Sequence, residues 1–548
     1  MLRGPRVTEP HVVMAVANPI AIDARVRKTA RSVRAMGYRV TLIYNSGTKG
    51  EVEEGDLDGV RTIGIPVPYY LHNRGRELKK RRAARMDAHR ACGFGYRTAE
   101  ERRVRAAQLA ARAARLRTDR VPVSLKAARL WHSARSRALT ARAEATRKRR
   151  LAQLRRPGKW RLELPHMVDL EGIFMPWMVD LDPDLLHVHD LAQLPTGVHA
   201  KLRLAGRGKT VPLIYDAHEY IAGWMVQHEY VHTAYTSAER EAIKHVDGVV
   251  TVSEPIAEAM QTELGLPVRP TVVLNAPPLA PGGIVANTAG SVTAGPAREV
   301  GAKVSADADA GVSAAPGGPG TGDVHMNPPV GIVAGGPLSV REAAGVGPGV
   351  PLVVFSGTVS PSRNLNRAVA ALEFLPEVHL AIVCVPNRDV PTAQSLQSIA
   401  RSIGAEDRLH LLNPVDTEVI AQFLSSATLG LDSMDTVRVQ HRYCLPNKLF
   451  DYLHAGLPVA VSSNPTEAEF VRSHGVGAVF DPNDPQDIAR GIRDVLERRA
   501  VYAAKASASA LLREYSWDTQ AAKLADLYHS LLPAAPAPSS SSSSPPPV

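Results

Sequence analysis

The chain has 548 residues, of which 45% are hydrophobic and 5% aromatic, and a formal net charge of +11. This length exceeds what one hydrophobic core supports, so we expect two or more domains. The sequence contains no continuous apolar run of about 18 residues, so we expect no membrane-spanning helix. The three cysteines, Cys92, Cys384 and Cys444, are far apart and odd in number, which argues against a disulfide framework or a cysteine metal site and favours a reducing compartment.

The N-terminal region alternates strand and helix signals. The apolar run 11–17 predicts a strand and not a signal peptide, a helical periodicity follows over 26–36, and 39–44 predicts the next strand. This β-α-β order implies a parallel sheet with a right-handed crossover. Further strands are predicted at 185–189, 211–216, 248–252 and 271–274.

A very basic insert interrupts this pattern. Residues 74–161 contain 29 Lys/Arg and 6 Asp/Glu, a balance of +23, which leaves +11 − 23 = −12 for the rest of the chain. Ala and Arg favour helix, so we predict long, solvent-facing helices over an insert spanning 72–162. Two interpretations stay open: peripheral contact with an anionic membrane surface, and a solvated or partly disordered insertion. Specific nucleic-acid binding is not expected, because the insert lacks interleaved aromatic residues.

A second α/β pattern follows a stretch rich in Gly, Ala and Pro. We therefore predict an N-terminal Rossmann-like domain over 1–280, a disordered linker over 281–337, a C-terminal domain over 338–515, a closing helix over 516–532 and a disordered tail over 533–548. In two such doubly wound halves, a ligand is expected at the carboxyl ends of the strands, in the cleft between them.

Several segments then follow one another in a characteristic order: ANPIAIDARVRKTARSVRAMGYRVTLI, HVHD, IYDAHE, TVSEPIAEAM, VVLNAPP, FSGTVSPSRNL and LPNKLFDYLHAGLPVAVSS. Together they resemble family-4 retaining glycosyltransferases, which have the GT-B fold. The resemblance implies a metal-independent hexosyl- or related glycosyltransferase that moves a sugar from a nucleotide diphosphate sugar to an acceptor hydroxyl with retention. Cell-envelope polysaccharide, glycolipid or related glycoconjugate synthesis is the implied setting, with no cofactor beyond the nucleotide sugar.

The resemblance places the nucleotide sugar in the C-terminal half. Backbone N–H groups after Gly357 and the Arg363 guanidinium would suit a diphosphate. The family usually has two cations near this glycine, and since Thr358 follows it here, we expect Lys448 to supply the second charge. Of two glutamates that the family has eight positions apart, Tyr443 replaces the first and Asp451 the second, which binds ribose hydroxyls. The predicted donor-binding residues are Gly357, Arg363, Asn364, Asn447, Lys448, Leu449 and Asp451.

The catalytic prediction falls on His218, which follows a predicted strand and matches the family histidine beside the transferred sugar. Asp23, Arg25 and Glu219 are predicted on the acceptor side. His187 and His189 share one face of a strand, but no metal site is predicted, because this fold uses helix dipoles and cations instead. No side chain is an evident general base, so the donor phosphate could take the acceptor proton.

Two other functions remain open from the sequence. A sugar-nucleotide 2-epimerase shares the architecture, although no set of carboxylates suited to its chemistry is evident. A non-catalytic binding or scaffold protein would explain Tyr443 in a glutamate's place. We expect a cytoplasmic protein, with peripheral contact at the inner face of the membrane through 74–161 as one interpretation of the insert; the sugar, the base and the acceptor are not specified.

Overall fold

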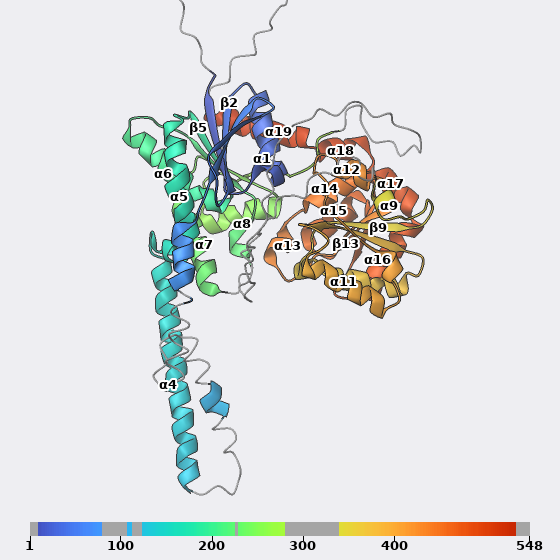
Figure 1. The fold of residues 1–548 in the computed structure, drawn as a ribbon, viewed down its shortest axis with the longest axis horizontal. Helices are drawn as coiled ribbons and strands as arrows, with labels where there is room; N and C mark the ends of the chain where they lie inside the picture. Colours follow the sequence, from blue (N-terminus) through green and yellow to red (C-terminus); the bar gives the residue numbers. More distant parts are fainter. Residues whose placement is uncertain are drawn as a thin grey trace, which may run out of the picture. The chain divides into compact units, whose positions relative to one another are not determined.

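The computed structural model describes residues 9–78, 80, 107–111, 123–224, 228–279 and 339–532. The predicted linker and tail lie outside these residues, as do 81–106 and 112–122 of the basic insert. The chain divides into two compact units (Figure 1): Met1–Ala222, His228–Val250 and Tyr528–Val548 form the first, and Gly223–Gln227 and Thr251–Leu527 form the second.

The N-terminal sheet has the strand order β3-β4-β2-β1-β5-β6-β7-β8. Its strand β1 pairs in parallel with β2 and β5, while β3 is the antiparallel partner of β4. Every residue of β1 is buried, as expected for a parallel strand covered on both faces. The strands are β1 (His11–Val16), β2 (Arg39–Gly47), β3 (Glu53–Leu57), β4 (Val60–Pro66), β5 (Leu185–His189), β6 (Leu213–Ala217), β7 (Gly248–Thr251) and β8 (Thr271–Val272).

The main helices of the first unit follow β1, β5 and β6 along the chain, as the alternating pattern predicts. They are α1 (Ala24–Ala35) after β1, α6 (Asp190–Gly206) after β5 and α7 (Glu229–Ala242) after β6, and a further helix, α5 (Pro165–Asp180), precedes β5. Helix α1 begins at a capped position, where the Asp23 carboxylate accepts a hydrogen bond from the Val26 N–H at 3.1 Å. This cap holds Asp23 at the carboxyl end of the sheet.

The basic insert contains one continuous helix, α4 (Val123–Leu154), of 32 residues (Figure 1). Its C-terminal part packs onto the first unit through buried Leu151 and Leu154, and Arg147 pairs with Glu229 of α7 at 2.5 Å. Leu130 and Trp131, near its start, are 68% and 53% exposed. Among the described residues, no helix has the length and apolar run that a membrane crossing needs.

The second unit is built on a six-stranded sheet in the order β11-β10-β9-β12-β13-β14, all parallel. Alternate residues of β9 enter two separate cores: Leu352 and Val354 pack on one face, Val353 and Phe355 on the other. The strands are β9 (Leu352–Thr358), β10 (His379–Val385), β11 (Leu409–Leu412), β12 (Leu429–Asp432), β13 (Val459–Ser462) and β14 (Gly477–Phe480).

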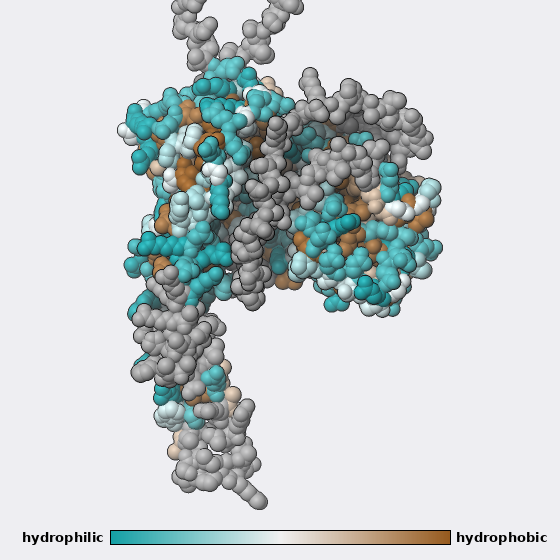
Figure 2. Space-filling model, in the orientation of Figure 1, coloured by the Kyte–Doolittle hydropathy of each residue, from teal (hydrophilic) through white to brown (hydrophobic). Residues whose placement is uncertain are grey.

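Helices cover both faces of this second sheet. The helices from residue 339 onward are α9 (Val340–Ala343), α10 (Leu365–Ala370), α11 (Pro391–Ser402), α12 (Ile420–Leu424), α13 (Val439–Tyr443), α14 (Asn447–His454), α15 (Pro465–His474), α16 (Pro485–Glu497), α17 (Arg499–Ala506), α18 (Ser509–Glu514) and α19 (Trp517–Leu531). On the face shown in Figure 2, the described surface is mainly hydrophilic with scattered apolar patches. The two sheets, each layered with helices, give the GT-B architecture that the sequence predicts.

The division between the units falls between Val250 and Thr251, about one helix earlier than the predicted boundary at 280. Helix α8 (Glu254–Leu264) belongs to the second unit because its N-cap residue, Ser253, donates its hydroxyl proton to the Tyr443 carbonyl at 2.6 Å. Ala257 and the residues after α8 also join the core of the second unit. The closing helix α19 begins in the second unit, and from Tyr528 onward it counts with the first.

Candidate functional site

In the first unit, neighbouring parallel strands β1, β5 and β6 end at the same edge of the sheet. The chain after each strand brings one polar side chain to this edge: Asp23, Asp190 and His218. One ligand atom from each of these three lies within 4.8 Å of the others. An α/β sheet binds its ligands at this edge. The structure brings the predicted residues His218 and Asp23 together here, beside Asp190.

Arg25 lies beneath this edge and does not line its surface. Its side chain is 4% exposed, and it forms a bidentate ion pair with Asp216 of β6, with Nη2 2.7 Å from Oδ1 and Nε 2.9 Å from Oδ2. The guanidinium is therefore held below the surface of this edge by a buried carboxylate, and the acceptor-side role of Arg25 stays a prediction. Glu219 is exposed beside His218.

His218 has a carboxylate at each ring nitrogen. Its Nδ1 lies 3.1 Å from an oxygen of Asp190, and its Nε2 lies 3.3 Å from Oδ2 of Asp216. Burial opposes the charged ring, but the two carboxylates outweigh it and raise the pKa of His218 to about 9. His218 is therefore an imidazolium at neutral pH, with both N–H groups directed at carboxylates.

Asp216 remains ionised beneath this ring. Burial alone would favour its neutral form, but Arg25 and His218 hold the pKa of Asp216 well below its usual range. The charges of the four groups then cancel, because the cations Arg25 and His218 face the carboxylates Asp216 and Asp190. Such pairing is what allows charges to remain inside a protein.

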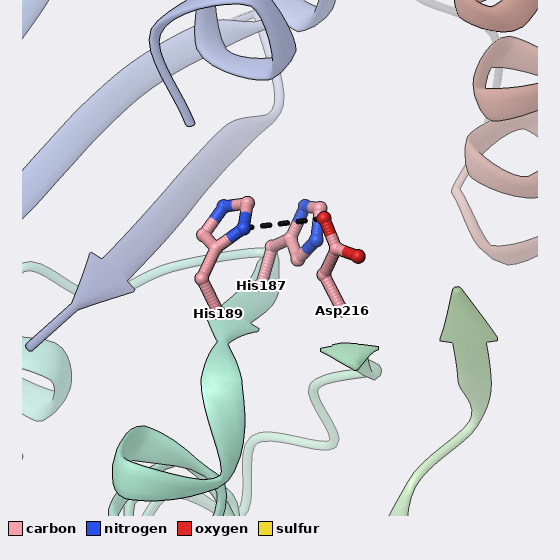
Figure 3. A group of neighbouring side chains, drawn as sticks. All are labelled: His187, His189 and Asp216. Atoms are coloured by element: carbon pink, nitrogen blue, oxygen red, sulfur yellow. Dashed lines mark ion pairs between the residues drawn. The ribbon is translucent and has the colours of Figure 1, made fainter. Parts of the chain in front are cut away.

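A second group of ligand-type side chains lies deeper, on β5 and β6 (Figure 3). His187 and His189 stack with ring centroids 4.4 Å apart, and His189 Nδ1 lies 3.3 Å from Asp216. Their ligand atoms and that of Asp216 lie within 4.8 Å, a spacing that could hold a metal ion. The Arg25 guanidinium already occupies both oxygens of Asp216 and would repel a cation, so we interpret the group as a hydrogen-bonded network.

This network extends to the end of the chain. The Tyr528 hydroxyl lies 2.7 Å from His187 Nδ1. Burial and the neighbouring His189 lower the pKa of His187 well below its usual value, so this ring is neutral. Tyr528, His187 and His189 thus form a buried chain of contacts that ends at Asp216.

Asp190, the other carboxylate at His218, is half-buried and had no predicted role. It is the first residue of α6 and has a left-handed backbone, with φ of 63°, which is unusual for a residue other than glycine. Its side chain is 26% exposed, against 2% for Asp216. Burial raises the pKa of Asp190 to about 6, although His218 opposes the shift. The sequence signal was its place directly after the buried HVH strand.

In the second unit, the predicted donor residues lie around the carboxyl end of β9. Gly357 has a φ of 137°, and a Cβ built on it would lie 3.5 Å from Lys448 Cε and 3.8 Å from Nζ. A side chain at 357 would therefore be both strained and packed against the lysine. The structure brings Gly357 and Lys448 together, as predicted from segments about 90 residues apart.

Lys448 is buried. Its side chain is 9% exposed, its Nζ lies 3.3 Å from Oδ1 of Asp432, and it sits 4.3 Å from the centre of the Phe355 ring. Burial lowers the pKa of Lys448, and Asp432 opposes this shift. Lys448 is thus a cation held beneath the strand end by a carboxylate and an aromatic face.

Glu467, on α15, completes this cluster and was not predicted. It is fully buried, and neither of its carboxyl oxygens has a hydrogen-bond partner among the described residues. Burial and the Asp432 carboxylate raise the pKa of Glu467 well above its usual range. A protonated Glu467 can donate to Asp432, which two ionised carboxylates cannot do. The sequence signal for its burial was that Glu467 lies three and four residues before the apolar Phe470 and Val471, on the same face of the helix.

The remaining donor predictions lie on loops and helix starts nearby. Arg363 is half-buried, and its carbonyl accepts a hydrogen bond from Ser433 Oγ at 2.6 Å. Asn364 has φ of 48°, and its buried side-chain nitrogen lacks a partner among the described residues. Asn447 is exposed and Asp451 half-buried on α14.

Leu449 does not fit a donor-binding role. Its side chain is buried in the second core, and its N–H already donates to the Pro446 carbonyl at 3.0 Å. Within the segment LPNKLFDY, the donor-binding candidates are therefore Asn447, Lys448 and Asp451, while Leu449 packs the helix against the core. Tyr443 lies on α13, and its carbonyl receives the Ser253 hydroxyl.

Two family models match the chain, one on each half. The model described as "Glycosyltransferase Family 4" matches residues 104–277, and "Glycosyl transferases group 1" matches residues 340–510. The chain belongs to glycosyltransferase family 4. The predicted family and the GT-B fold are thereby confirmed.

Among curated relatives of this family-4 glycosyltransferase are two described as D-inositol 3-phosphate glycosyltransferase. The protein from Xylanimonas cellulosilytica is 28% identical over 228 residues, 40% of this chain and 52% of the relative. The protein from Mycobacteroides abscessus is 27% identical over 202 residues, 35% of this chain and 42% of the relative. The chain therefore spans about half the length of the curated relatives it matches.

Among solved structures, sucrose-phosphate synthase from Thermosynechococcus elongatus has the same fold. The match has a TM-score of 0.58 with 12% sequence identity, and it covers 95% of this chain and 99% of that one. At this identity the likeness concerns the fold alone.

Proposed function

We propose that this protein transfers a sugar from a nucleotide diphosphate sugar to an acceptor hydroxyl. The observation that carries the proposal is the Lys448 ammonium held against Gly357 at the carboxyl end of β9. A glycine there lets a ligand approach the backbone, and the buried cation supplies charge for a diphosphate. Arg363 and the exposed start of α14 at Asn447 add further donors around the same strand end.

The first unit supplies the chemistry in this proposal. His218 is an imidazolium that can stabilise negative charge or hold a sugar hydroxyl during transfer, and the Arg25–Asp216 pair fixes its ring. We propose transfer with retention of anomeric configuration, without a metal ion. A metal is not needed if Lys448 and Arg363 neutralise the leaving diphosphate.

Binding of the donor can be tested without knowing the acceptor. We would measure the melting temperature of the full chain with UDP-, GDP- and ADP-sugars, since a ligand that binds only the native state raises it. We expect one nucleotide class to raise the melting temperature, and that donor to release its nucleotide diphosphate slowly when water is the acceptor.

Different outcomes identify the other functions. Conversion of the sugar nucleotide to its epimer without release of a nucleotide diphosphate would identify an epimerase. Binding without any conversion would identify a non-catalytic protein. No shift with any sugar nucleotide would contradict the placement of the donor at Gly357 and Lys448.

The acceptor and the setting are also proposals. Because the two curated relatives are described as acting on D-inositol 3-phosphate, we would test inositol phosphates first, beside lipid-linked sugars. We propose a role in cell-envelope polysaccharide, glycolipid or related glycoconjugate synthesis. New glycoside formed from one of these acceptors, detected by mass spectrometry, would support it.

The composition of helix α4 favours contact with a membrane surface, where a lipid-linked acceptor would lie. Its 32 residues include nine Lys/Arg and one Asp/Glu, and Trp131 and Leu130 are exposed beside them. Basic residues attract an anionic lipid surface, and an exposed Trp suits the interface of a bilayer. We propose that α4 makes peripheral contact with an anionic membrane, which the composition of the described part of the insert supports.

Vesicle co-sedimentation tests this contact. Exposed Arg135, Arg137 and Arg142 would be changed to Gln in the full chain, with Arg207, Arg401 and Arg472 changed to Gln as the matched control. At about 1 kcal/mol per basic residue, the α4 variant should bind phosphatidylglycerol vesicles roughly 100-fold more weakly than the control. Equal binding by both variants, or binding that survives 1 M salt, would contradict an electrostatic contact.

A further inference from the structure

The strand order of the second unit reverses between β9 and β12. The chain runs from β9 outward to β10 and β11, and it returns as β12 on the opposite side of β9. In open α/β sheets a ligand binds at such a switch point, outside the carboxyl ends of the two strands. Gly357 lies near the end of β9 and Asp432 is the last residue of β12, so the expected ligand position lies between these two residues.

The two strands separate at this point. β9 and β12 are paired as far as Val354 and Gly430. The described sheet has no pairing between them beyond these residues, although β9 stays paired with β10 as far as Thr358. In this register, the next backbone hydrogen bond of a parallel ladder would run from the Ser356 N–H to the Leu431 carbonyl.

The Tyr452 hydroxyl takes the place of that hydrogen bond. It accepts a hydrogen bond from the Ser356 N–H at 3.0 Å and donates one to the Leu431 carbonyl, also at 3.0 Å. Tyr452 is fully buried, and burial raises its pKa well above the usual value, so the hydroxyl is neutral and can do both. Because an oxygen atom lies between the two backbone groups, the strands are farther apart than a direct hydrogen bond would hold them.

Gly430 and Lys448 connect this bridge to the donor site. A Cβ built on Gly430 would overlap the Tyr452 ring, so the glycine makes room for the ring against β12. Tyr452 lies on α14 four residues after Lys448, so both side chains leave the same face of the helix. The Lys448 ammonium lies 3.3 Å from Asp432, while Tyr452 bonds to Leu431, the residue before it. One helix face therefore supplies both the predicted donor-site cation and the side chain that separates the strands.

We propose that Tyr452 is a positioning residue of the donor site, which keeps the ends of β9 and β12 apart so that a diphosphate fits between Gly357 and Lys448. The inference rests on the proposed function and adds a residue to it. Tyr452 acts through the backbone, because its hydroxyl already bonds to both strands and its ring is fully buried. The group through which it acts is the N–H of Ser356, the residue before Gly357.

The test compares Tyr452→Phe with Tyr502→Phe in the full chain. Phenylalanine keeps the ring against Gly430 and removes only the hydroxyl, so the first variant should fold. Tyr502 is the matched control, because it is also buried and its hydroxyl donates to Asp494 at 3.0 Å, a bond that joins α17 to α16 and involves no strand. The probes are whichever of the UDP-, GDP- and ADP-sugars raises the melting temperature of the wild-type chain, and the nucleoside monophosphate of the same base.

We expect Tyr452→Phe to bind the sugar nucleotide roughly tenfold more weakly than the wild-type chain does, which corresponds to the loss of one neutral hydrogen bond. Its affinity for the nucleoside monophosphate should be unchanged, because that ligand has no diphosphate to fit between the strand ends. Tyr502→Phe should bind both ligands as the wild-type chain does, although each variant loses a buried hydrogen bond and should melt at a lower temperature. Isothermal titration would measure the affinities.

Three results would overturn the assignment. Wild-type affinity of Tyr452→Phe for the sugar nucleotide would show that the hydroxyl does not shape the donor site. Equal weakening for both ligands, or the same loss in Tyr502→Phe, would show that the hydroxyl supports the fold in general. A wild-type chain that binds no sugar nucleotide would instead contradict the proposed function itself, which keeps the two failures distinguishable.

Discussion

The Tyr528 hydroxyl lies 2.7 Å from Nδ1 of His187, although 341 residues separate the two in the chain. Both side chains are fully buried, and His187 stacks on His189 beside Asp216. The last turn of α19 is therefore part of the wall behind the His218 site.

Tyr528→Phe should lower the stability of the chain by about 1–3 kcal/mol, because it leaves His187 Nδ1 buried without its partner. Urea denaturation would measure the change. Tyr44→Phe is the control, since the Tyr44 hydroxyl makes only a long, 3.5 Å contact to Glu53 at the surface and should change stability little. Equal stability of the two variants would show that the Tyr528 contact contributes nothing.

Arg363→Ala should weaken donor binding without a large loss of stability, because Arg363 is half-buried at a short turn. A charged hydrogen bond contributes roughly 1.5–3 kcal/mol, which is on the order of tenfold or more in affinity. Isothermal titration with the nucleotide diphosphate would measure it. Arg401→Ala, a surface arginine of the same unit, is the control and should bind as wild type.

Lys448→Met should weaken donor binding and also destabilise the fold by about 3–5 kcal/mol, because it removes the cation that faces the buried Asp432 carboxylate. The double variant Lys448→Met with Asp432→Asn should recover much of the stability and none of the donor affinity. If the double variant binds the nucleotide diphosphate as wild type does, Lys448 has no part in the donor site.

His218→Ala should lower turnover far more than donor affinity, because a group near the reacting carbon acts mainly in the transition state. The pH dependence has a definite sign. His218 must be charged to donate from both nitrogens, so the wild-type rate should fall as pH rises through about 9. Its contribution to stability is complete below the unfolded pKa of about 6.5 and is lost as pH rises to about 9.

Measuring kcat and thermal stability from pH 7 to 10 would test this assignment. His218→Gln, which keeps a hydrogen-bond donor but cannot titrate, should lack both dependences. A wild-type rate that is constant across this range would show that the charge on His218 is not used.

Glu467→Gln should retain the fold and stabilise it increasingly as pH rises. The folded-state pKa of Glu467 lies above its unfolded value, so the wild-type chain takes up a proton on folding and loses stability as pH rises above about 4.5. Glutamine keeps the shape of the neutral acid and removes this dependence. Denaturation at pH 5 and pH 8 would measure the difference, and a variant that is less stable at pH 8 would show that Glu467 is ionised in the folded chain.

Much of the fold could be predicted from the sequence, because its strands are short apolar runs bounded by turns. The predicted 185–189 matches β5, and 11–17 matches β1 within one residue. The hairpin of β3 and β4 was missed, since Glu53–Leu57 is polar and exposed and becomes a strand only by pairing with β4.

The candidate site was predicted only where it follows from strand ends. His218 and Gly357 lie at the carboxyl ends of parallel strands, so predicting the strands was enough to place them at the ligand-binding edge of each sheet. The partnership of Arg25 with Asp216 joins residues 191 apart, and nothing local indicates it. The burial of Lys448 beside Asp432 and Glu467 likewise depends on how α14 and α15 pack, which the helical pattern of each one alone does not fix.

The path of the chain between the units has a practical consequence for dissecting this protein. The first unit is discontinuous: its chain leaves after Val250 and returns at Tyr528, so the second unit is inserted within it. A fragment ending at Val250 would lack Tyr528 and leave His187 without its hydroxyl partner. Cutting the gene at a single point therefore yields no intact N-terminal half, whereas an N-terminal piece joined to the last turn of α19 would keep all the groups of the His218 site.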